Sequence, residues 1–171
     1  MVILRPTRKL FRDLRPSRDV DGASDTALGD WYVNRLVVDR RPLLLIVSSK
    51  SLLSLLIPAR DVRSLPTQLA TLTGNRLRRL GVGEALVQAE LAAMTPVVVA
   101  PTTDRSVMGT IVDFAKNIPY YLEIGGWDET TLPFVEARLA ETPCHAARRF
   151  EQVIFPERDA PKLLVDRWHA A

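Results

Sequence analysis

The chain has 171 residues, 47% of them hydrophobic and 25% charged, which is the size and composition of one globular domain with a buried core. Its 23 Lys and Arg against 20 Asp and Glu leave a net charge of +3, too small by itself to indicate a nucleic-acid or membrane partner. The single cysteine, Cys144, excludes an internal disulfide framework. Because the chain has only two histidines, His145 and His169, as further nitrogen or sulfur ligands, we expect no metal and no cofactor.

The N-terminal region predicts a strand, a helix and a loop. Residues 2–4 form the strand pattern, and apolar residues at helical spacing over 10–14 predict a helix that ends at Pro16. The segment 17–29 is polar, contains glycine and has no period, so we predict a mobile loop. Because the chain is charged from Arg5 onward and lacks the apolar run of a secretory signal, we expect a cytoplasmic protein.

Three strand patterns follow. Residues 31–38 are rich in aromatic and β-branched side chains, and 43–47 and 52–57 are apolar runs too short for helices. With a polar turn over 48–51, they predict an antiparallel meander in which 43–47 and 52–57 are adjacent central strands, since both are too apolar for a sheet edge. A membrane helix here would place Lys50 near the bilayer centre, at a cost of roughly 2.5–3.5 kcal/mol, so we expect no membrane association.

The rest of the chain is mainly helical. The predicted elements are helices over 62–80, interrupted near Pro66 and Gly74, and over 84–94, a buried strand over 96–100, a helix over 105–118 with Asp104 as N-cap and Pro119 as its end, a helix over 130–140, and a C-terminal extension over 151–171. This order predicts one α+β domain over 1–171. A small, mainly antiparallel sheet, made of the three-stranded meander and one or two further strands, would pack with four or five helices.

The segment at 28–32, Leu-Gly-Asp-Trp-Tyr, is a candidate binding motif. Gly29 permits a positive φ, and the Asp30 side chain can bond to backbone amides and close the turn. Trp31 and Tyr32 point to opposite faces of a strand, so we expect at most one of them to lie fully in the core. The other ring is then available to a ligand or partner, although both could simply anchor the loop.

The predicted helix at 105–118 carries a polar face opposite its apolar one, with Arg105, Gly109 and Asp113 at successive turns. Glycine inside a helix costs about 1 kcal/mol relative to alanine, so we predict that this face is covered and that Arg105 meets Asp30 in a polar cluster. An Arg–Asp bridge closing a packed interface is the alternative. The candidate binding residues are Asp30, Trp31, Tyr32, Arg105, Ser106, Gly109 and Asp113.

Charge is unevenly distributed along the chain. Residues 1–20 and 60–82 each carry a net +4, whereas 83–144 carries −6. If the two basic segments form one face, we expect weak, sequence-independent and salt-sensitive binding of nucleic acid. The residues of that predicted face are Arg8, Lys9, Arg12, Arg76, Arg78 and Arg79.

Four sequence motifs together resemble a known family. They are the start at 4–10, the Leu-Gly-Asp-Trp-Tyr segment at 28–32, Arg-Ser-Val-Met-Gly at 105–109 ending in Asp113-Phe114, and Glu-Thr-Pro-Cys at 141–144. Over residues 1 to about 155 the sequence resembles a family of uncharacterised bacterial proteins. The resemblance implies a domain of unknown function and names no reaction.

We expect a non-enzymatic binding or regulatory module that acts through a protein partner or self-association. Cys144 and His145 are poor candidates for a catalytic pair, because side chains adjacent in sequence point apart, so we interpret Cys144 as a small buried hydrophobe. One alternative is an oligomerising accessory protein. Another is a small enzyme or a phosphate- or nucleotide-binding protein that uses Asp30, Arg105, Ser106 and Asp113.

Overall fold

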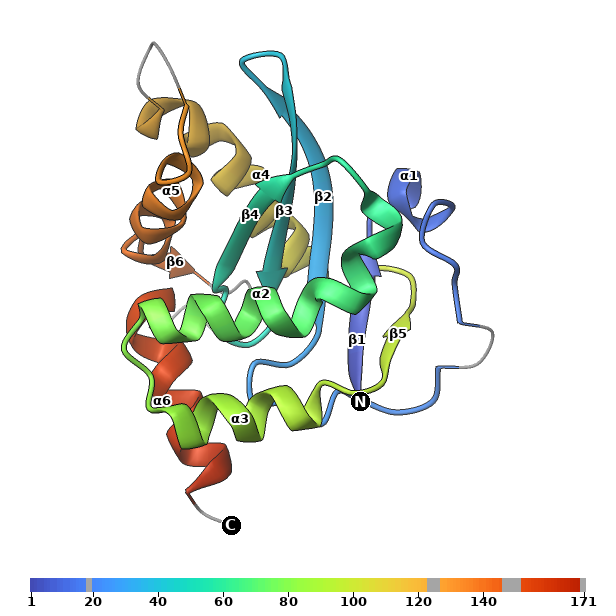
Figure 1. Cartoon of the computed structure of the whole chain (residues 1–171), viewed down its shortest axis with the longest axis vertical. Helices are drawn as coiled ribbons and strands as arrows, with labels where there is room; N and C mark the ends of the chain where they lie inside the picture. The colour runs from blue at the N-terminus through green and yellow to red at the C-terminus, as the bar shows by residue number, and fades with distance from the viewer. Residues whose placement is uncertain (18–19, 123–126, 146–151, 170–171) are drawn as a thin grey trace.

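Five strands form one mixed sheet in the order β4-β3-β2-β1-β5, with helices on both faces (Figure 1). The computed structural model describes residues 1–17, 20–122, 127–145 and 152–169. The strands are β1 (Val2–Pro6), β2 (Trp31–Val38), β3 (Arg41–Ser48), β4 (Ser54–Pro58) and β5 (Val97–Val99), and a separate pair is formed by β6 (Cys144–His145) and β7 (Val153–Ile154). The helices are α1 (Arg8–Phe11), the 3₁₀ helix η1 (Val62–Ser64), α2 (Leu65–Arg79), α3 (Glu84–Ala93), α4 (Arg105–Tyr121), α5 (Thr131–Ala140) and α6 (Pro156–Trp168).

The predicted α+β class is confirmed, and so is the meander, because β2, β3 and β4 pair antiparallel in sequence order. β1 adds to β2 in parallel, and β5 adds to β1 in parallel at the far edge. The described part of the chain holds six α-helices rather than four or five.

The position predicted for the second apolar strand is wrong, because β4 lies at the edge of the sheet. Leu55 and Leu56 on β4 are nevertheless buried, one on each face. Helices flank this edge strand, α2 toward one face and α5 toward the other, so its apolar sequence reflects covering helices and not a central position.

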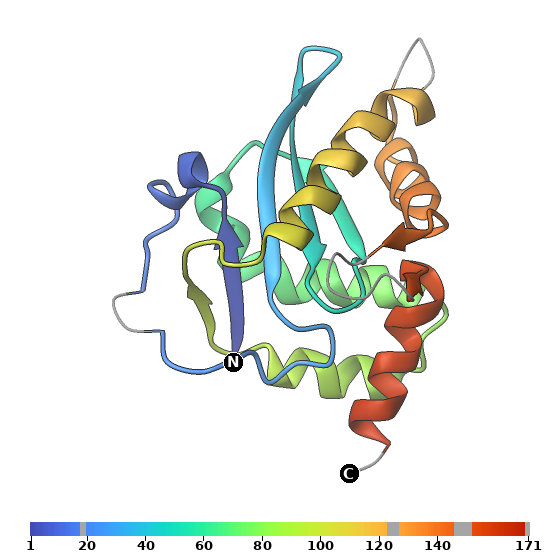
Figure 2. The same cartoon turned by 180° about the vertical axis from the view of Figure 1, so that it is seen from behind.

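Two hydrophobic cores lie on the two faces of the sheet. Helix α2 crosses the face seen in Figure 1 with α3 packed beside it, and the core on this side, which includes Trp31, Ile46 and Leu69, also takes in Leu164 of α6. Helices α4 and α5 cover the opposite face, seen in Figure 2, over a core that includes Leu45 and Phe114. No helix of the described ranges is long and apolar enough to cross a bilayer.

Prolines and glycines interrupt the helices less than predicted. Pro66 lies in the first turn of α2, where its missing amide costs nothing, and the helix continues through Gly74. A side chain at Gly74 would meet the Leu91 side chain at 2.9 Å, so this glycine permits the close approach of α2 and α3. Pro119 lies inside α4 and does not end it, since the helix continues to Tyr121.

Part of the segment 17–29 is fixed to the rest of the molecule. The Glu90 carboxylate on α3 is completely buried and accepts hydrogen bonds from the amides of Ala27 and Leu28, at 2.8 and 3.1 Å. The same carboxylate accepts a bond from the indole of Trp168 on α6, at 2.9 Å. Residues 18–19 of the predicted loop lie outside the described residues, and the mobility of its first half stays a prediction.

Candidate functional site

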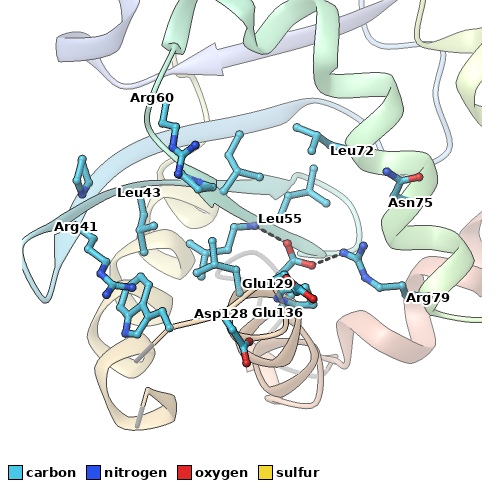
Figure 3. A pocket seen from close by; sticks show the side chains of 17 residues that line it. Arg41, Leu43, Leu55, Arg60, Leu72, Asn75, Arg79, Asp128, Glu129 and Glu136 are labelled. Carbon is cyan, nitrogen blue, oxygen red and sulfur yellow. Dashed lines mark hydrogen bonds and ion pairs between the residues drawn. The ribbon is translucent and has the colours of Figure 1, made fainter. Parts of the chain in front are cut away.

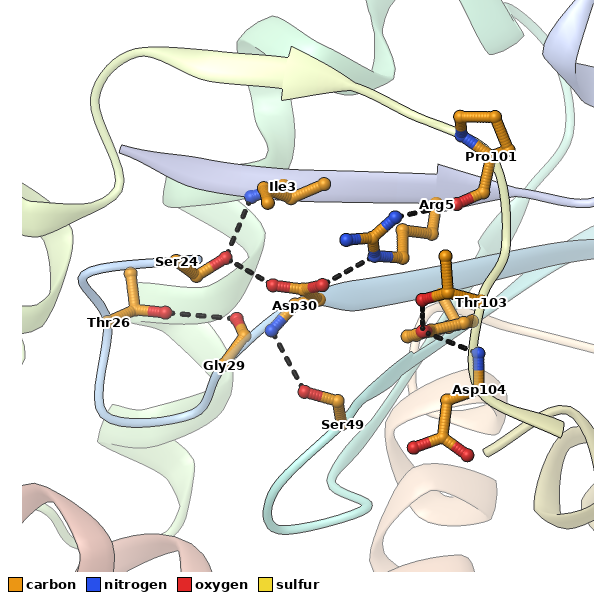
Figure 4. Close-up of polar contacts among 11 residues, drawn as sticks. Ile3, Arg5, Ser24, Thr26, Gly29, Asp30, Ser49, Pro101, Thr103 and Asp104 are labelled. Carbon is orange, nitrogen blue, oxygen red and sulfur yellow. Dashed lines mark hydrogen bonds and ion pairs between the residues drawn. The ribbon is translucent and has the colours of Figure 1, made fainter. Parts of the chain in front are cut away.

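Asp30 is held by a network that does not include Arg105 (Figure 4). Its carboxylate accepts from the Arg5 guanidinium at 2.5 Å and from the Ser24 hydroxyl at 2.6 Å, and its amide donates to the Ser49 hydroxyl at 2.9 Å. The predicted pairing of Asp30 with Arg105 is therefore wrong. The parallel register sets Arg5 of β1 opposite Tyr32 of β2, beside Asp30, and this long-range pairing brings a different arginine to the carboxylate.

Trp31 and Tyr32 lie on opposite faces of β2 as predicted, but both are buried, with 0% and 2% of their surface exposed. The expectation that one ring stays outside the core is wrong, because helices cover both faces of the sheet. The Tyr32 hydroxyl bonds to the Thr103 hydroxyl and accepts from the Asp104 amide, both at 3.1 Å (Figure 4). Both rings therefore serve as anchors between the motif and its surroundings.

The polar face of α4 is solvated, so the predicted covered cluster is wrong. Arg105 and Gly109 are exposed, and a side chain at Gly109 would meet nothing within 4 Å. Asp113 has 73% of its side chain exposed and lies 3.9 Å from the Lys116 ammonium, while Ser106 is only half-buried. This polar face stays exposed to solvent because α4 packs against the sheet through its opposite, apolar face.

A side chain of the protein occupies two of the amides at the start of α4. Asp104 is the predicted N-cap, and its carboxylate accepts from the amides of Ser106 and Val107, at 2.8 and 3.4 Å. This cap satisfies donors that a phosphate would otherwise use. The arrangement gives no support to a phosphate site built on Ser106.

The predicted single basic face is not formed. Arg8, Lys9 and Arg12 are exposed on and just after α1, whereas the other three arginines lie at the C-terminal end of α2, on the opposite side of the molecule (Figure 1). Arg76 is buried, and Arg78 forms an exposed ion pair with Glu84 at 2.7 Å. Helix α2 runs across the sheet, so its C-terminal arginines point away from α1.

A groove of about 740 Å³ runs along the free edge of β4 (Figure 3). Helix α2 forms one wall with Leu72, and the turn before α5 together with α5 itself forms the other with Trp127 and Leu132. Leu55 and Leu56 of β4 lie between these walls. The groove therefore straddles the edge of the sheet and is mainly apolar.

Three charged residues of two helices meet at and below the floor of the groove, which Glu136 and Arg79 line. Glu136 of α5 is 4% exposed, and its Oε1 accepts from the Leu56 amide at 2.8 Å while its Oε2 accepts from the Arg79 guanidinium at 2.6 Å (Figure 3). Arg76, with 3% of its surface exposed, places its Nε 3.6 Å from the same Oε2. Arg76 also donates to the backbone carbonyls of Ser54 and Glu136, at 3.4 and 3.1 Å.

Burial and charge act in opposite directions on these groups. Burial raises the pKa of Glu136 above its ordinary value, opposed by the Leu56 amide and by the guanidiniums of Arg79 and Arg76. Burial likewise lowers the pKa of Arg76, and the Glu136 carboxylate counteracts this shift. The cluster is thus an ion-paired network in which each buried charge depends on its partners.

One end of the groove carries cations and an aromatic ring. The Arg41 guanidinium lies 4.3 Å from the centre of the Trp127 ring, and Arg60 lines the groove close by (Figure 3). Asp128 on the opposite wall accepts from the amide and hydroxyl of Thr130, at 2.8 and 2.6 Å, and these bonds lower its pKa. Asp128 therefore organises the start of α5, while Arg41 and Arg60 are free of ion pairs within the described residues.

Sequence reasoning missed this groove, although a signal was present. Glu136 stands between Leu132 and Leu139 at helical spacing, so it occupies an apolar face of its helix. Arg76 similarly lies on the same face as Leu69 and Leu72. Charged residues at apolar positions of two helices predict buried partners, but their pairing requires the tertiary structure.

Cys144 lies in β6 away from this groove. Burial raises the pKa of its thiol to about 11, so the thiol is protonated at neutral pH. His145 beside it is exposed. This environment is that of a small buried side chain and not of a nucleophile.

Comparisons with known proteins identify a family and no activity. Neither a curated protein nor a solved structure matches the chain significantly. A family profile matches residues 3–159, from the start of β1 into the first turn of α6. The chain therefore belongs to the family described as a domain of unknown function, DUF6933.

Proposed function

We propose that the protein is a non-enzymatic binding module whose ligand occupies the groove along β4. The observation that carries the proposal is a mainly apolar groove of about 740 Å³ with a few fixed polar groups. Small-molecule sites typically have volumes of about 300–1,000 Å³ and this kind of lining.

The bonding of Glu136 favours binding over catalysis. A general base must be free to take a proton, but both oxygens of Glu136 already accept bonds from Leu56 and Arg79. Breaking a buried ion pair costs about 3–5 kcal/mol, so the carboxylate is better suited to fixing the walls of the groove.

The same contacts favour a small ligand over an added peptide strand. A strand that pairs with β4 would need the outward amide of Leu56, which Glu136 occupies, and Pro58 has no amide to offer. The cations at the Arg41 and Arg60 end suit an acidic group, and the leucine-lined centre suits an apolar body. We therefore propose an amphipathic anion, such as a long-chain carboxylate, as the ligand class.

Titration with dodecanoate, followed through tryptophan fluorescence, tests the proposal because Trp127 lines the groove. Arg60→Gln should weaken dodecanoate binding by about 10- to 100-fold, since a charge-assisted contact contributes about 1.5–3 kcal/mol, and should leave dodecanol binding unchanged. Leu72→Trp should fill the groove and weaken binding of both compounds.

The control is Lys162→Gln, which removes an exposed cation on α6, away from the groove. Binding of neither compound to the wild type would refute the groove as a site for this ligand class. Equal affinities of wild type and Leu72→Trp would show that the compounds bind elsewhere.

A further inference from the structure

Positive charge is concentrated at one end of the molecule, built from α1, the second half of β2 with the turn to β3, and the connection from β4 to α2 (Figure 1). We call this surface the basic end, and its residues are Arg8, Lys9, Arg12, Arg35, Arg40, Arg41, Arg60 and Arg63. All eight are exposed. Three acidic residues, Asp13, Asp39 and Asp61, accompany them, so the basic end carries +5 where the whole chain carries +3.

Backbone contacts hold the segments of the basic end together. The Thr7 amide at the start of α1 donates to the Val33 carbonyl of β2 at 2.9 Å, two residues before Arg35. The Ala59 amide donates to the Pro42 carbonyl at 3.0 Å, which places Arg60 next to the start of β3. Figures 1 and 2 both show α1 beside the connection that contains η1, so the cations of these two segments are neighbours, and the β2–β3 turn extends from the same end of the sheet.

The cations of the basic end lack acidic partners in the described ranges. Every ion pair within the described ranges involves a cation outside the basic end, such as Arg5 with Asp30 or Arg79 with Glu136. Asp61 bonds to the backbone amide of Arg63 and not to its guanidinium. Like charges gathered on one surface repel each other, so an anionic partner is favoured there.

We infer that the basic end binds the phosphate backbone of nucleic acid without reading its sequence. Seven of the eight cations are arginines, whose planar guanidinium can bond two phosphate oxygens at once. A continuous polyanion can contact several of them together and releases condensed counterions as it does so. The basic end includes the three α1-region residues of the predicted basic face but none of its three α2 arginines. The inference does not depend on a ligand in the β4 groove.

Fluorescence anisotropy with labelled single-stranded RNA and duplex DNA of about 20 nucleotides, at about 50 and 200 mM salt, tests this inference. The test variant combines Arg8→Glu, Arg35→Glu and Arg63→Glu, none of which lines the groove. The matched control combines Lys50→Glu, Lys116→Glu and Lys162→Glu, which changes the net charge equally at exposed sites outside the basic end.

We expect the wild type to bind at low salt and to lose affinity steeply at the higher salt. The test variant should lose at least about tenfold in affinity and show a shallower salt dependence, while the control keeps most of the wild-type affinity. Circular dichroism melts establish whether each protein folds. If the test variant does not fold, a variant with Gln at the same three positions replaces it, and we expect the same loss of affinity. No wild-type binding at low salt, or an equal loss in both triple variants, would overturn the inference.

Discussion

The ion cluster below the β4 groove makes a quantitative prediction about Arg76. Replacing Arg76 by Ala removes a buried guanidinium and leaves the carbonyls of Ser54 and Glu136 without the donors that now reach them at 3.4 and 3.1 Å. It also takes one of two cations from the Glu136 carboxylate. Removing one member of a buried ion pair costs about 3–5 kcal/mol, a figure that already includes the partners left unsatisfied, so we expect a loss of about 3–5 kcal/mol.

Urea denaturation followed by circular dichroism measures this loss. For a chain of this size, a loss of about 3–5 kcal/mol corresponds to a fall in Tm of roughly 6–20 °C. Arg79→Ala should cost less, at most about 1 kcal/mol, because 43% of its side chain is exposed and water can replace the contact.

Arg78→Ala is the matched control, since Arg78 lies on the same helix and its pair with Glu84 is exposed. Its urea midpoint should equal that of the wild type. If Arg76→Ala unfolds at the same urea concentration as Arg78→Ala, the buried cluster does not stabilise the fold.

Four further outcomes are expected. Because the pKa of Glu136 is raised, the native state binds a proton at Glu136 more readily than the unfolded state does. The unfolding free energy of the wild type, relative to that of Glu136→Gln, should therefore increase as pH falls from 7 toward the ordinary glutamate pKa of 4.5. Urea titrations that give a constant difference between the two proteins across this range would contradict the shift. Cys144, with a thiol pKa of about 11, should react with a disulfide reagent at pH 7 only after unfolding, and rapid modification of the native protein would count against its burial. Leu45→Asp should prevent folding because Leu45 is completely buried on β3, an interior strand between β4 and β2, so a soluble, cooperatively melting variant refutes the placement. Gly109→Ala should raise the unfolding free energy by about 0.5–1 kcal/mol, since the added methyl meets nothing within 4 Å, and a destabilised variant would show that the face is covered.

Local sequence patterns determined most of the secondary structure. The strand predicted over 31–38 coincides with β2, and Asp104 caps α4 as its side chain and position predicted. These features depend on residues within a few positions of each other, through alternation of side chains, helical spacing and capping bonds. The family membership also follows from the sequence, over residues 3–159.

The tertiary structure decided which strands and charges are neighbours. The sequence shows that β4 is apolar, but it does not show that β4 lies at the edge of the sheet. That position results because the chain continues through α2 and α3 and adds β5 on the far side of β1, not next to β4. The partner of Asp30 is Arg5, 25 residues away, because two parallel strands align in one register.

The β4 groove depends in the same way on segments that are distant in the sequence. Glu136 reaches Leu56, 80 residues away, and Arg79, 57 residues away. A pattern within one helix shows that a charge is buried, but its partner comes from another element whose position depends on the packing of the whole core. The sequence by itself therefore determined the elements and their apolar faces, while the sites between elements were decided by how those faces pack together.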